Sequence, residues 1–201
     1  MTPRSPFARR VRVALHENEI SFKERVFDVF QPSPELFKAN PLGRVPALIL
    51  ENGQVLIDSC LILQALYEDE ESKFMPRDRS RRLKVFHAQS IAQGMCEKTV
   101  EYFLEKLRPE NIQDPENLAE IDAVLVRAIG RFEEMLATSG DGYLVENGGE
   151  PTQADFDLGT TLAYMKFRYP LKWEVSHPRA AGLLARMNER PSFQKTVPLP
   201  A

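Results

Sequence analysis

The chain has 201 residues, 43% of them hydrophobic and 27% charged, which supplies enough apolar surface for a core and excludes a wholly disordered protein. Its 26 Lys and Arg residues are interspersed with 29 Asp and Glu residues, so no basic region predicts a nucleic-acid partner. The longest apolar run covers residues 45–50, far short of the roughly 20 residues that a membrane span needs.

The N-terminal sequence MTPRSPFARR lacks the apolar stretch of a secretory signal peptide. Cys60 and Cys96 form no Cys-x-x-Cys motif, so neither a disulfide framework nor a dithiol redox site is expected. The three histidines lie on different predicted helices and lack metal-ligand spacing. We therefore expect a soluble, cytoplasmic protein without a bound metal.

The first elements in chain order are short. Residues 5–18 are predicted to form a helix, because Pro6 suits a first turn and apolar residues recur on one face. Residues 24–30 carry the Val and Phe residues typical of a strand. Residues 34–39 have the length of one or two helical turns before an Asn-Pro pair stops them.

A hairpin and a third helix are predicted next. Residues 47–50 and 54–57 flank an Asn-Gly pair, the strongest short-range hairpin signal. Asp58 and Ser59 then precede residues whose apolar side chains share one helical face. The N-terminal part is therefore predicted to be a small α/β domain with antiparallel pairing.

A polar stretch over residues 68–82 is interpreted as the linker between two unlike domains, at residues 1–72 and 79–201. The second domain is predicted to be all-helical. Its long helices are expected at residues 80–107, 115–138, 152–168 and 177–189.

Ser5 is a candidate for chemistry at the start of the first helix. Its hydroxyl can cap the free N–H groups of the helix, and Pro6 fits the next position. The functional alternative is that a hydroxyl beside a helix N-terminus stabilises a bound anion such as a thiolate.

Two further candidates flank the hairpin. Asp58 and Ser59 are either a helix cap or a site for an amino-acid head group, with the hydroxyl on the carboxylate and Asp58 on the ammonium. Pro46 belongs at the beginning or edge of a strand. A cis bond before it would leave the backbone of Val45 open to pair with an extended peptide.

Other polar residues favour structural interpretations. Thr152 and Asp155 have the spacing of a helix capping box before an apolar run. Cys96 lies among apolar residues in the middle of a predicted helix, which favours a core position. Nothing near Cys60 in the sequence indicates a lowered thiol pKa.

Taken in order, these motifs resemble the glutathione S-transferase family over nearly the whole chain. The segment SPFARRVRVALHE is similar to the family's active-site loop and first helix, NPLGRVPALIL to the strand entry with a cis-proline, and IDSCLILQALYE to the acidic-Ser pair and its helix. The capping box, FMPRD and RPSF add to the resemblance, which is greatest to small bacterial members.

The resemblance implies a thioredoxin-like N-terminal domain, an all-helical C-terminal domain and a homodimer. It also implies that glutathione is the co-substrate, with the hydroxyl of Ser5 on its sulfur and the thiolate adding to a small electrophile. The residues implied to contact the rest of glutathione are Phe7, Arg44, Val45, Pro46, Asp58 and Ser59.

The chain departs from the family pattern at its start. Family members place a β-strand directly before the active-site loop, whereas only Met1-Thr2-Pro3-Arg4 precede Ser5 here. Four residues ending in Pro-Arg cannot supply a central strand. Either Met1 is an internal methionine of a longer chain, or the sheet lacks this strand. If the active-site loop is shifted, Thr2 is the alternative hydroxyl for the sulfur.

The sequence leaves the electrophile open. Met95, Thr99, Tyr102 and Phe103 are candidates to contact it, although core packing is the alternative for each apolar residue. Isomerase, dehalogenase and peroxidase activities also occur on this fold. The alternative function is a non-catalytic binding or regulatory protein of the stringent-starvation type, which predicts a degraded glutathione site.

Overall fold

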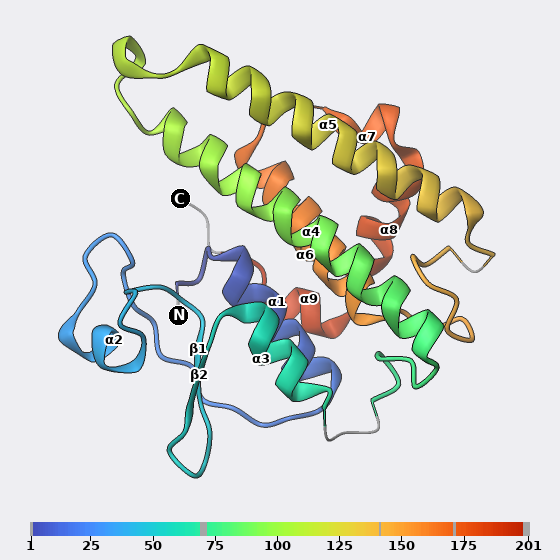
Figure 1. Ribbon diagram of the computed structural model, residues 1–201, viewed down its shortest axis with the longest axis horizontal. Helices are drawn as coiled ribbons and strands as arrows, with labels where there is room; N and C mark the ends of the chain where they lie inside the picture. Colours follow the sequence, from blue (N-terminus) through green and yellow to red (C-terminus); the bar gives the residue numbers. More distant parts are fainter. Residues whose placement is uncertain (1, 69–71, 141, 171, 199–201) are drawn as a thin grey trace. The chain divides into compact units, whose positions relative to one another are not determined.

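The computed structural model describes residues 2–68, 72–140, 142–170 and 172–198, and the chain divides into two compact units (Figure 1). The first unit comprises Met1–Ser72 together with Arg190–Ala201, and the second comprises Lys73–Glu189. The stretch from Arg190, which the sequence analysis places in the helical domain, therefore belongs to the first unit.

The first unit contains a hairpin and several helices. Its strands β1 (Ala47–Ile49) and β2 (Val55–Ile57) pair antiparallel, with Leu48 opposite Leu56, which confirms the predicted hairpin. The described helices of this unit are α1 (Pro6–Glu17), α2 (Pro34–Ala39), α3 (Ser59–Leu66) and α9 (Pro191–Lys195). The first three were expected from the sequence, whereas α9 was not.

The predicted strand over residues 24–30 is wrong, because the structure assigns no strand there. A strand requires a hydrogen-bonded neighbour, and residues 2–4 do not provide one. They form a turn instead, in which the Ser5 N–H donates to the Thr2 carbonyl at 3.0 Å. The predicted inability of this start to supply a central strand is thus confirmed over the described residues.

The core of the first unit lies between α1, α3 and the hairpin (Figure 1). Its buried side chains come from one face of each helix, namely Val11, Ala14, Leu15, Ile62 and Leu63. Leu48 and Leu56 of the hairpin pack against this cluster. Because a lone hairpin is marginal in water, burial against the two helices is what stabilises it.

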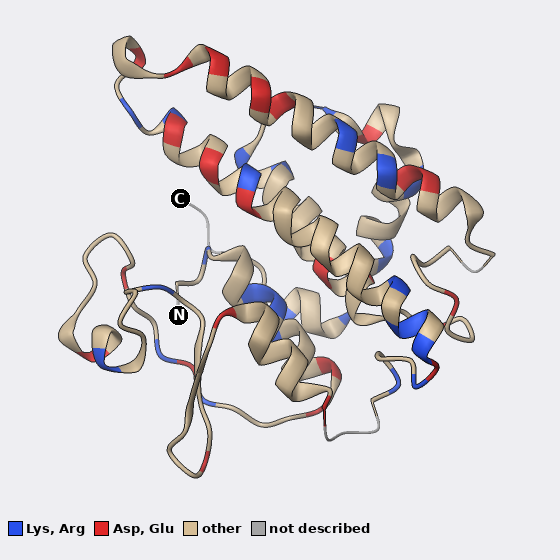
Figure 2. Cartoon of the chain, viewed as in Figure 1, with Lys and Arg blue, Asp and Glu red and all other residues tan. Residues whose placement is uncertain are grey.

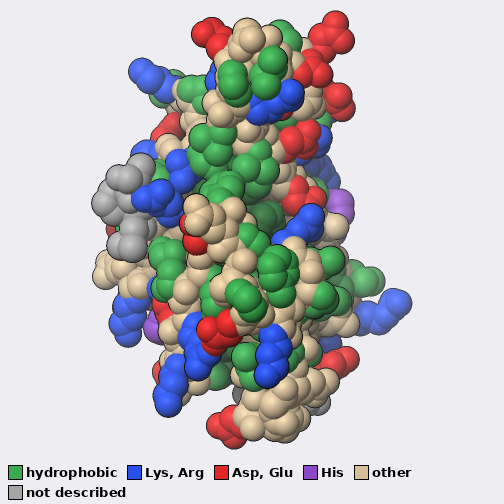
Figure 3. All heavy atoms as spheres, turned by 90° about the vertical axis from the view of Figure 1, so that its left-hand side faces the viewer, with side chains coloured by type: hydrophobic (Ala, Val, Ile, Leu, Met, Phe, Trp, Pro, Cys, Tyr) green, Lys and Arg blue, Asp and Glu red, His purple; other side chains and the backbone are tan. Residues whose placement is uncertain are grey.

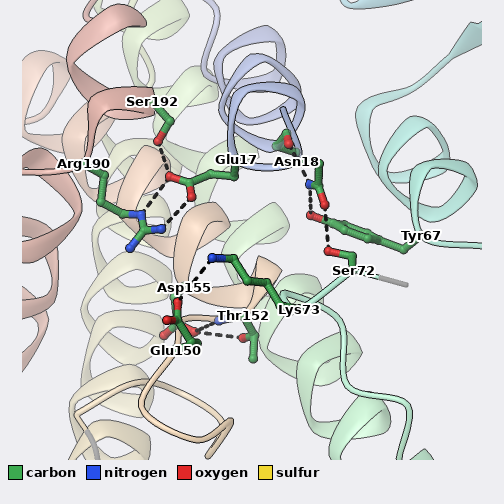
Figure 4. Close-up of polar contacts among 11 residues, drawn as sticks. Glu17, Asn18, Tyr67, Ser72, Lys73, Glu150, Thr152, Asp155, Arg190 and Ser192 are labelled. Atoms are coloured by element: carbon green, nitrogen blue, oxygen red, sulfur yellow. Dashed lines mark hydrogen bonds and ion pairs between the residues drawn. The ribbon is translucent and has the colours of Figure 1, made fainter. Parts of the chain in front are cut away.

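The C-terminal stretch supplies polar partners to α1. Glu17 accepts hydrogen bonds from the Arg190 guanidinium at 2.7 and 2.6 Å and from the Ser192 hydroxyl (Figure 4). Arg9 is buried and donates to the Phe193 carbonyl at 3.3 Å. Burial lowers the pKa of Arg9 to about 10. Thus α9 is joined to α1 by hydrogen bonds with Glu17 and Arg9.

The second unit is helical throughout its described elements. These are α4 (Arg79–Lys106), the 3-10 turn η1 (Glu110–Ile112), α5 (Pro115–Thr138), α6 (Gln153–Arg168), α7 (Trp173–Ser176) and α8 (Pro178–Asn188). The long helices confirm the sequence prediction, and the two shortest were missed because one turn carries no periodic signal. Helix α6 contacts both α4 and α8 and is buried on nearly all sides over its first three turns.

A capping box begins α6. Asp155 is fully buried, and its carboxylate accepts hydrogen bonds from the N–H of Thr152 at 2.7 Å and from the Thr152 hydroxyl at 2.9 Å (Figure 4). It also accepts from the N–H of Leu144 at 2.8 Å. The predicted box is confirmed, and the same carboxylate fixes the loop that leads into the helix.

Charge is spread over the described surface. Both signs occur along α4 and α5 (Figure 2), and on the face seen in Figure 3 they are scattered among apolar side chains. Within the described ranges, no helix is both long and apolar enough to cross a bilayer.

We expect Asp155→Ala to lower the free energy of unfolding by about 2–4 kcal/mol, because it leaves buried N–H donors without their acceptor. The matched control is Asp78→Ala at the exposed start of α4, where the carboxylate accepts from the Arg81 N–H at 2.9 Å. Losing an exposed cap costs about 1 kcal/mol. Urea unfolding of both variants measures the difference, and equal losses would contradict this account.

Candidate functional site

Ser5 lies at the N-cap of α1. Its hydroxyl accepts a hydrogen bond from the Ala8 N–H at 3.2 Å, and Pro6 occupies the first turn. A hydroxyl can accept and donate at once, and no described residue accepts the proton of Ser5. Capping the helix and donating to a ligand are therefore compatible roles. Phe7, in the same turn, is half-buried.

Thr2, the alternative hydroxyl, is engaged elsewhere. It donates to the Phe27 carbonyl at 2.8 Å. A hydroxyl has a single proton, so this contact leaves Thr2 with none for a thiolate. Of the two hydroxyls, Ser5 is the one whose proton has no acceptor among the described residues.

The start of α3 combines an exposed acid with a buried hydroxyl. Asp58 is the N-cap, and its carboxylate accepts from the N–H groups of Cys60 at 2.8 Å and Leu61 at 3.4 Å. Its φ of 70° lies in the left-handed region, which disfavours residues with a Cβ. Ser59 follows directly and is buried, with 3% of its surface exposed.

Arg10 reaches this helix start from α1, a contact that the sequence analysis missed. The side chain is buried, and its guanidinium donates to the Ser59 hydroxyl at 2.6 Å and to the Cys60 sulfur at 2.9 Å. The available signal was its helical spacing, since Arg10 lies three residues after Phe7 and four before Ala14 on the predicted apolar side.

The peptide bond between Val45 and Pro46 is cis. Among the described residues, no group pairs with the backbone N–H or C=O of Val45. The preceding loop is fixed by Asn40, a buried amide that the sequence analysis did not single out, which donates to the Arg44 carbonyl at 2.8 Å. The side chain of Arg44 itself is exposed.

The hairpin register places two of the candidate sites at one end of the ladder. Ala47 pairs with Ile57, so the residues just outside the ladder are Pro46 on one strand and Asp58 on the other. Val45, Asp58 and Ser59 therefore lie at the same end of the sheet. Through Arg10, α1 contacts this end as well.

The candidate electrophile contacts on α4 are of two kinds. Met95 and Thr99 are buried in the core of the second unit. The Thr99 hydroxyl donates to the Met95 carbonyl at 2.8 Å. Tyr102 and Phe103 are half-buried. The ring of Tyr102 packs edge-on against Tyr169 at 4.8 Å between centroids.

The described residues include no group of His, Cys, Asp and Glu side chains that could hold a metal ion. Burial, followed by the charges of Lys195 and Arg12, lowers the pKa of His16. Cys96 is buried in the second unit, whereas Cys60 is exposed.

Comparison with known proteins supports this arrangement over most of the chain. Residues 4–69 match the family described as "Glutathione S-transferase, N-terminal domain", and residues 115–186 match "Glutathione S-transferase, C-terminal domain". The chain belongs to the glutathione S-transferase family. Its thioredoxin-like N-terminal part and helical C-terminal part are those of a glutathione S-transferase, as the sequence predicted.

Solved structures of other family members are similar to this one. A glutathione S-transferase from Methylobacillus flagellatus, solved with glutathione bound, is 29% identical with a TM-score of 0.91 and covers 99% of this chain and 98% of its own. A glutathione transferase family member from Pseudomonas fluorescens Pf-5, also with bound glutathione, is 30% identical with a TM-score of 0.83 over 100% and 98% of the two chains.

Curated relatives span the family's enzymes and an uncharacterised protein. Glutathione S-transferase Z2 from Arabidopsis thaliana is 26% identical over 97% of this chain and 87% of its own. An uncharacterised GST-like protein, YibF from Escherichia coli K12, is 26% identical over 96% of this chain and 95% of its own.

Substitutions of Asp58 separate the effect of its cap on stability from the effect of its positive φ. We expect Asp58→Asn to preserve stability, since Asn also caps helices and tolerates positive φ. Asp58→Gly loses the cap but relieves the backbone, whereas Asp58→Ala loses the cap and keeps the strain. Thermal unfolding should rank the variants Asn, Gly, Ala, with about 1 kcal/mol between Gly and Ala. An Ala variant as stable as the Gly variant would contradict this assignment.

Proposed function

We propose that this chain is a glutathione S-transferase that adds the thiolate of glutathione to a small electrophile. Membership of the family supports the proposal, as do similar structures solved with glutathione bound. The observation that carries it is the start of α3, where an exposed carboxylate and a buried hydroxyl stand on consecutive residues, Asp58 and Ser59.

In this proposal the γ-glutamyl end of glutathione binds at α3. Its α-carboxylate accepts from the hydroxyl and backbone N–H of Ser59, where the N-terminus of the helix favours negative charge. Its ammonium group pairs with the exposed carboxylate of Asp58. Because Asp58 also caps the helix, the acid is held at the site before the ligand arrives.

The cysteinyl part of glutathione pairs with the backbone of Val45. Support comes from the unengaged N–H and C=O of Val45 in the described structure and from its place at the same end of the hairpin as Asp58. Pro46 and Phe7 line the pocket for this part of the ligand. The exposed side chain of Arg44 adds a positive charge near the tripeptide.

Ser5 stabilises the sulfur as a thiolate. A free thiol has a pKa near 8.5, and only the deprotonated form attacks. A hydrogen bond from the hydroxyl, together with the N-terminus of α1, lowers this pKa by about one unit, which corresponds to roughly 1.4 kcal/mol. The thiol proton passes to solvent, and the sulfur lone pair forms a bond to an electrophilic carbon. That carbon gives up an electron pair, either to a leaving group or from a π bond whose new carbanion takes a proton from solvent, and Ser5 is not covalently modified.

The nucleophilic sulfur belongs to glutathione, so the reaction requires no protein cysteine. Position 5 is accordingly Ser and not Cys. We further propose that the chain acts in the cytoplasm as a homodimer.

The alternative to a transferase is a non-catalytic binding protein of the stringent-starvation type. Glutathione binding decides between these two functions.

Calorimetric titration of glutathione tests the site directly. Wild-type protein should bind with a dissociation constant in the micromolar to millimolar range. Ser59→Ala should weaken binding at least about tenfold, since a hydrogen bond to a charged group is worth about 1.5–3 kcal/mol. Asp58→Asn should also weaken it while keeping the cap. Ser176→Ala, in the second unit, is the control and should bind normally. A folded wild-type protein that does not bind would refute the proposed function.

A second test separates catalysis by Ser5 from its capping role. Ser5→Ala should raise the pKa of bound glutathione by about one unit, as measured by the ultraviolet absorbance of the thiolate against pH. The matched control is Ser33→Ala, because Ser33 also precedes a proline and caps α2 by accepting from the Leu36 N–H at 3.3 Å. Both variants should lose about 1 kcal/mol of stability. An unchanged thiol pKa in Ser5→Ala would contradict the role of the hydroxyl.

A further inference from the structure

Arg10 is a buried cation that contacts the start of α3, where the proposed ligand site lies. Only 3% of its surface is exposed, although it lies in the second turn of α1. A buried charge is costly unless it is hydrogen-bonded, and two of the partners of Arg10 stand on the first two residues of α3, at 2.6 Å to the Ser59 oxygen and 2.9 Å to the Cys60 sulfur. The neighbouring Arg9 turns instead toward the C-terminal stretch.

The chemistry of the guanidinium decides how the Ser59 hydroxyl is used. Arginine has N–H donors and no acceptor, so in this contact the oxygen of Ser59 must accept. The single proton of the hydroxyl is therefore directed elsewhere. Among the described residues none accepts it, although Ser59 is buried. Because buried polar groups are normally hydrogen-bonded, this proton is available to a ligand that can accept it.

We propose that Arg10 is a positioning residue that commits Ser59 to donate, and so selects ligands with a free carboxylate at this place. This inference rests on the proposed function, in which the γ-glutamyl α-carboxylate binds Ser59. The guanidinium also adds positive potential at the N-terminus of α3, which favours an anion over a neutral group. Arg10 does not touch the ligand in this scheme.

The selectivity is greatest against an amide. A carboxylate only accepts hydrogen bonds, whereas a carboxamide presents an NH2 group that would face the proton of Ser59 or leave one partner unsatisfied. Replacing the γ-glutamyl α-carboxylate of glutathione by a carboxamide should therefore weaken binding to the wild-type protein at least about tenfold.

Two substitutions of Arg10 test whether the side chain at position 10 must donate hydrogen bonds and be unable to accept them. Arg10→Lys keeps a cation that can only donate and should retain most of the preference for the carboxylate. Arg10→Gln offers a carbonyl oxygen, so the Ser59 hydroxyl can turn inward and donate to it. In Arg10→Gln we expect the dissociation constant of the analogue, divided by that of glutathione, to fall at least about threefold below the wild-type ratio, since the backbone N–H of Ser59 still favours the carboxylate.

The matched control is Arg12→Gln, which makes the same change two residues along α1. Arg12 is paired with Glu24 at 2.6 Å and makes no hydrogen bond or ion pair with α3 in the described structure. Its ratio of dissociation constants should equal that of the wild type. Enzyme kinetics provide a second readout, since Arg10→Gln should raise the KM for glutathione and leave kcat at saturating glutathione within about twofold.

The outcomes distinguish this inference from the proposed function. If wild-type protein binds neither ligand, the proposed function fails. If it binds glutathione and the carboxamide analogue equally, the inference is overturned while the function stands, and this result needs no variant to fold. Circular dichroism checks the folding of each variant. A folded Arg10→Gln protein that discriminates as well as Arg12→Gln would likewise overturn the role of Arg10.

Discussion

A short hairpin that cannot stabilise itself in water is the constraint on which the first unit depends. Apolar side chains of α1 and α3 must cover it, so each helix is held by burial against Leu48 and Leu56. That burial places the two helices against the hairpin, and each helix begins at its own N-cap. Their N-termini carry Ser5 and Asp58, and the hairpin register adds Val45 at the same end as Asp58. The arrangement of the proposed site thus follows from the burial of the small sheet against the two helices.

In the proposed function, capping and ligand binding use the same side chains of this unit. Ser5 and Asp58 each accept hydrogen bonds from the free N–H groups of a helix, which orients them without consuming every polar atom. A cap is therefore not an alternative to a functional role, as the sequence analysis treated it. The helix fixes the side chain and leaves a proton or a lone pair for a further hydrogen bond. Such preorganisation spares a ligand the entropy of ordering its contacts.

Local signals explain most of what the sequence predicted. The Asn-Gly pair, the capping box at Asp155 and the periodicity of the long helices each act within a few residues, and each is confirmed. The failures involve distant parts of the chain. Residues 24–30 have strand-like composition but no neighbour to pair with. The contact of Arg10 with α3 spans 49 residues, and that of α9 with α1 joins the two ends of the chain. No local pattern encodes such pairings.

The return of the chain to its first unit has a consequence for biosynthesis. Ribosomes release the N-terminal residues first, and domains that are continuous in sequence can fold as they emerge. Here the partners of Glu17 and Arg9 lie in residues 190–196, which are made after the whole of the second unit. The helical unit, continuous from Lys73 to Glu189, can fold while synthesis is still under way. The first unit is therefore completed only after the second has been synthesised, and the guanidinium of Arg9 lacks its partners until residues 190–196 have left the ribosome.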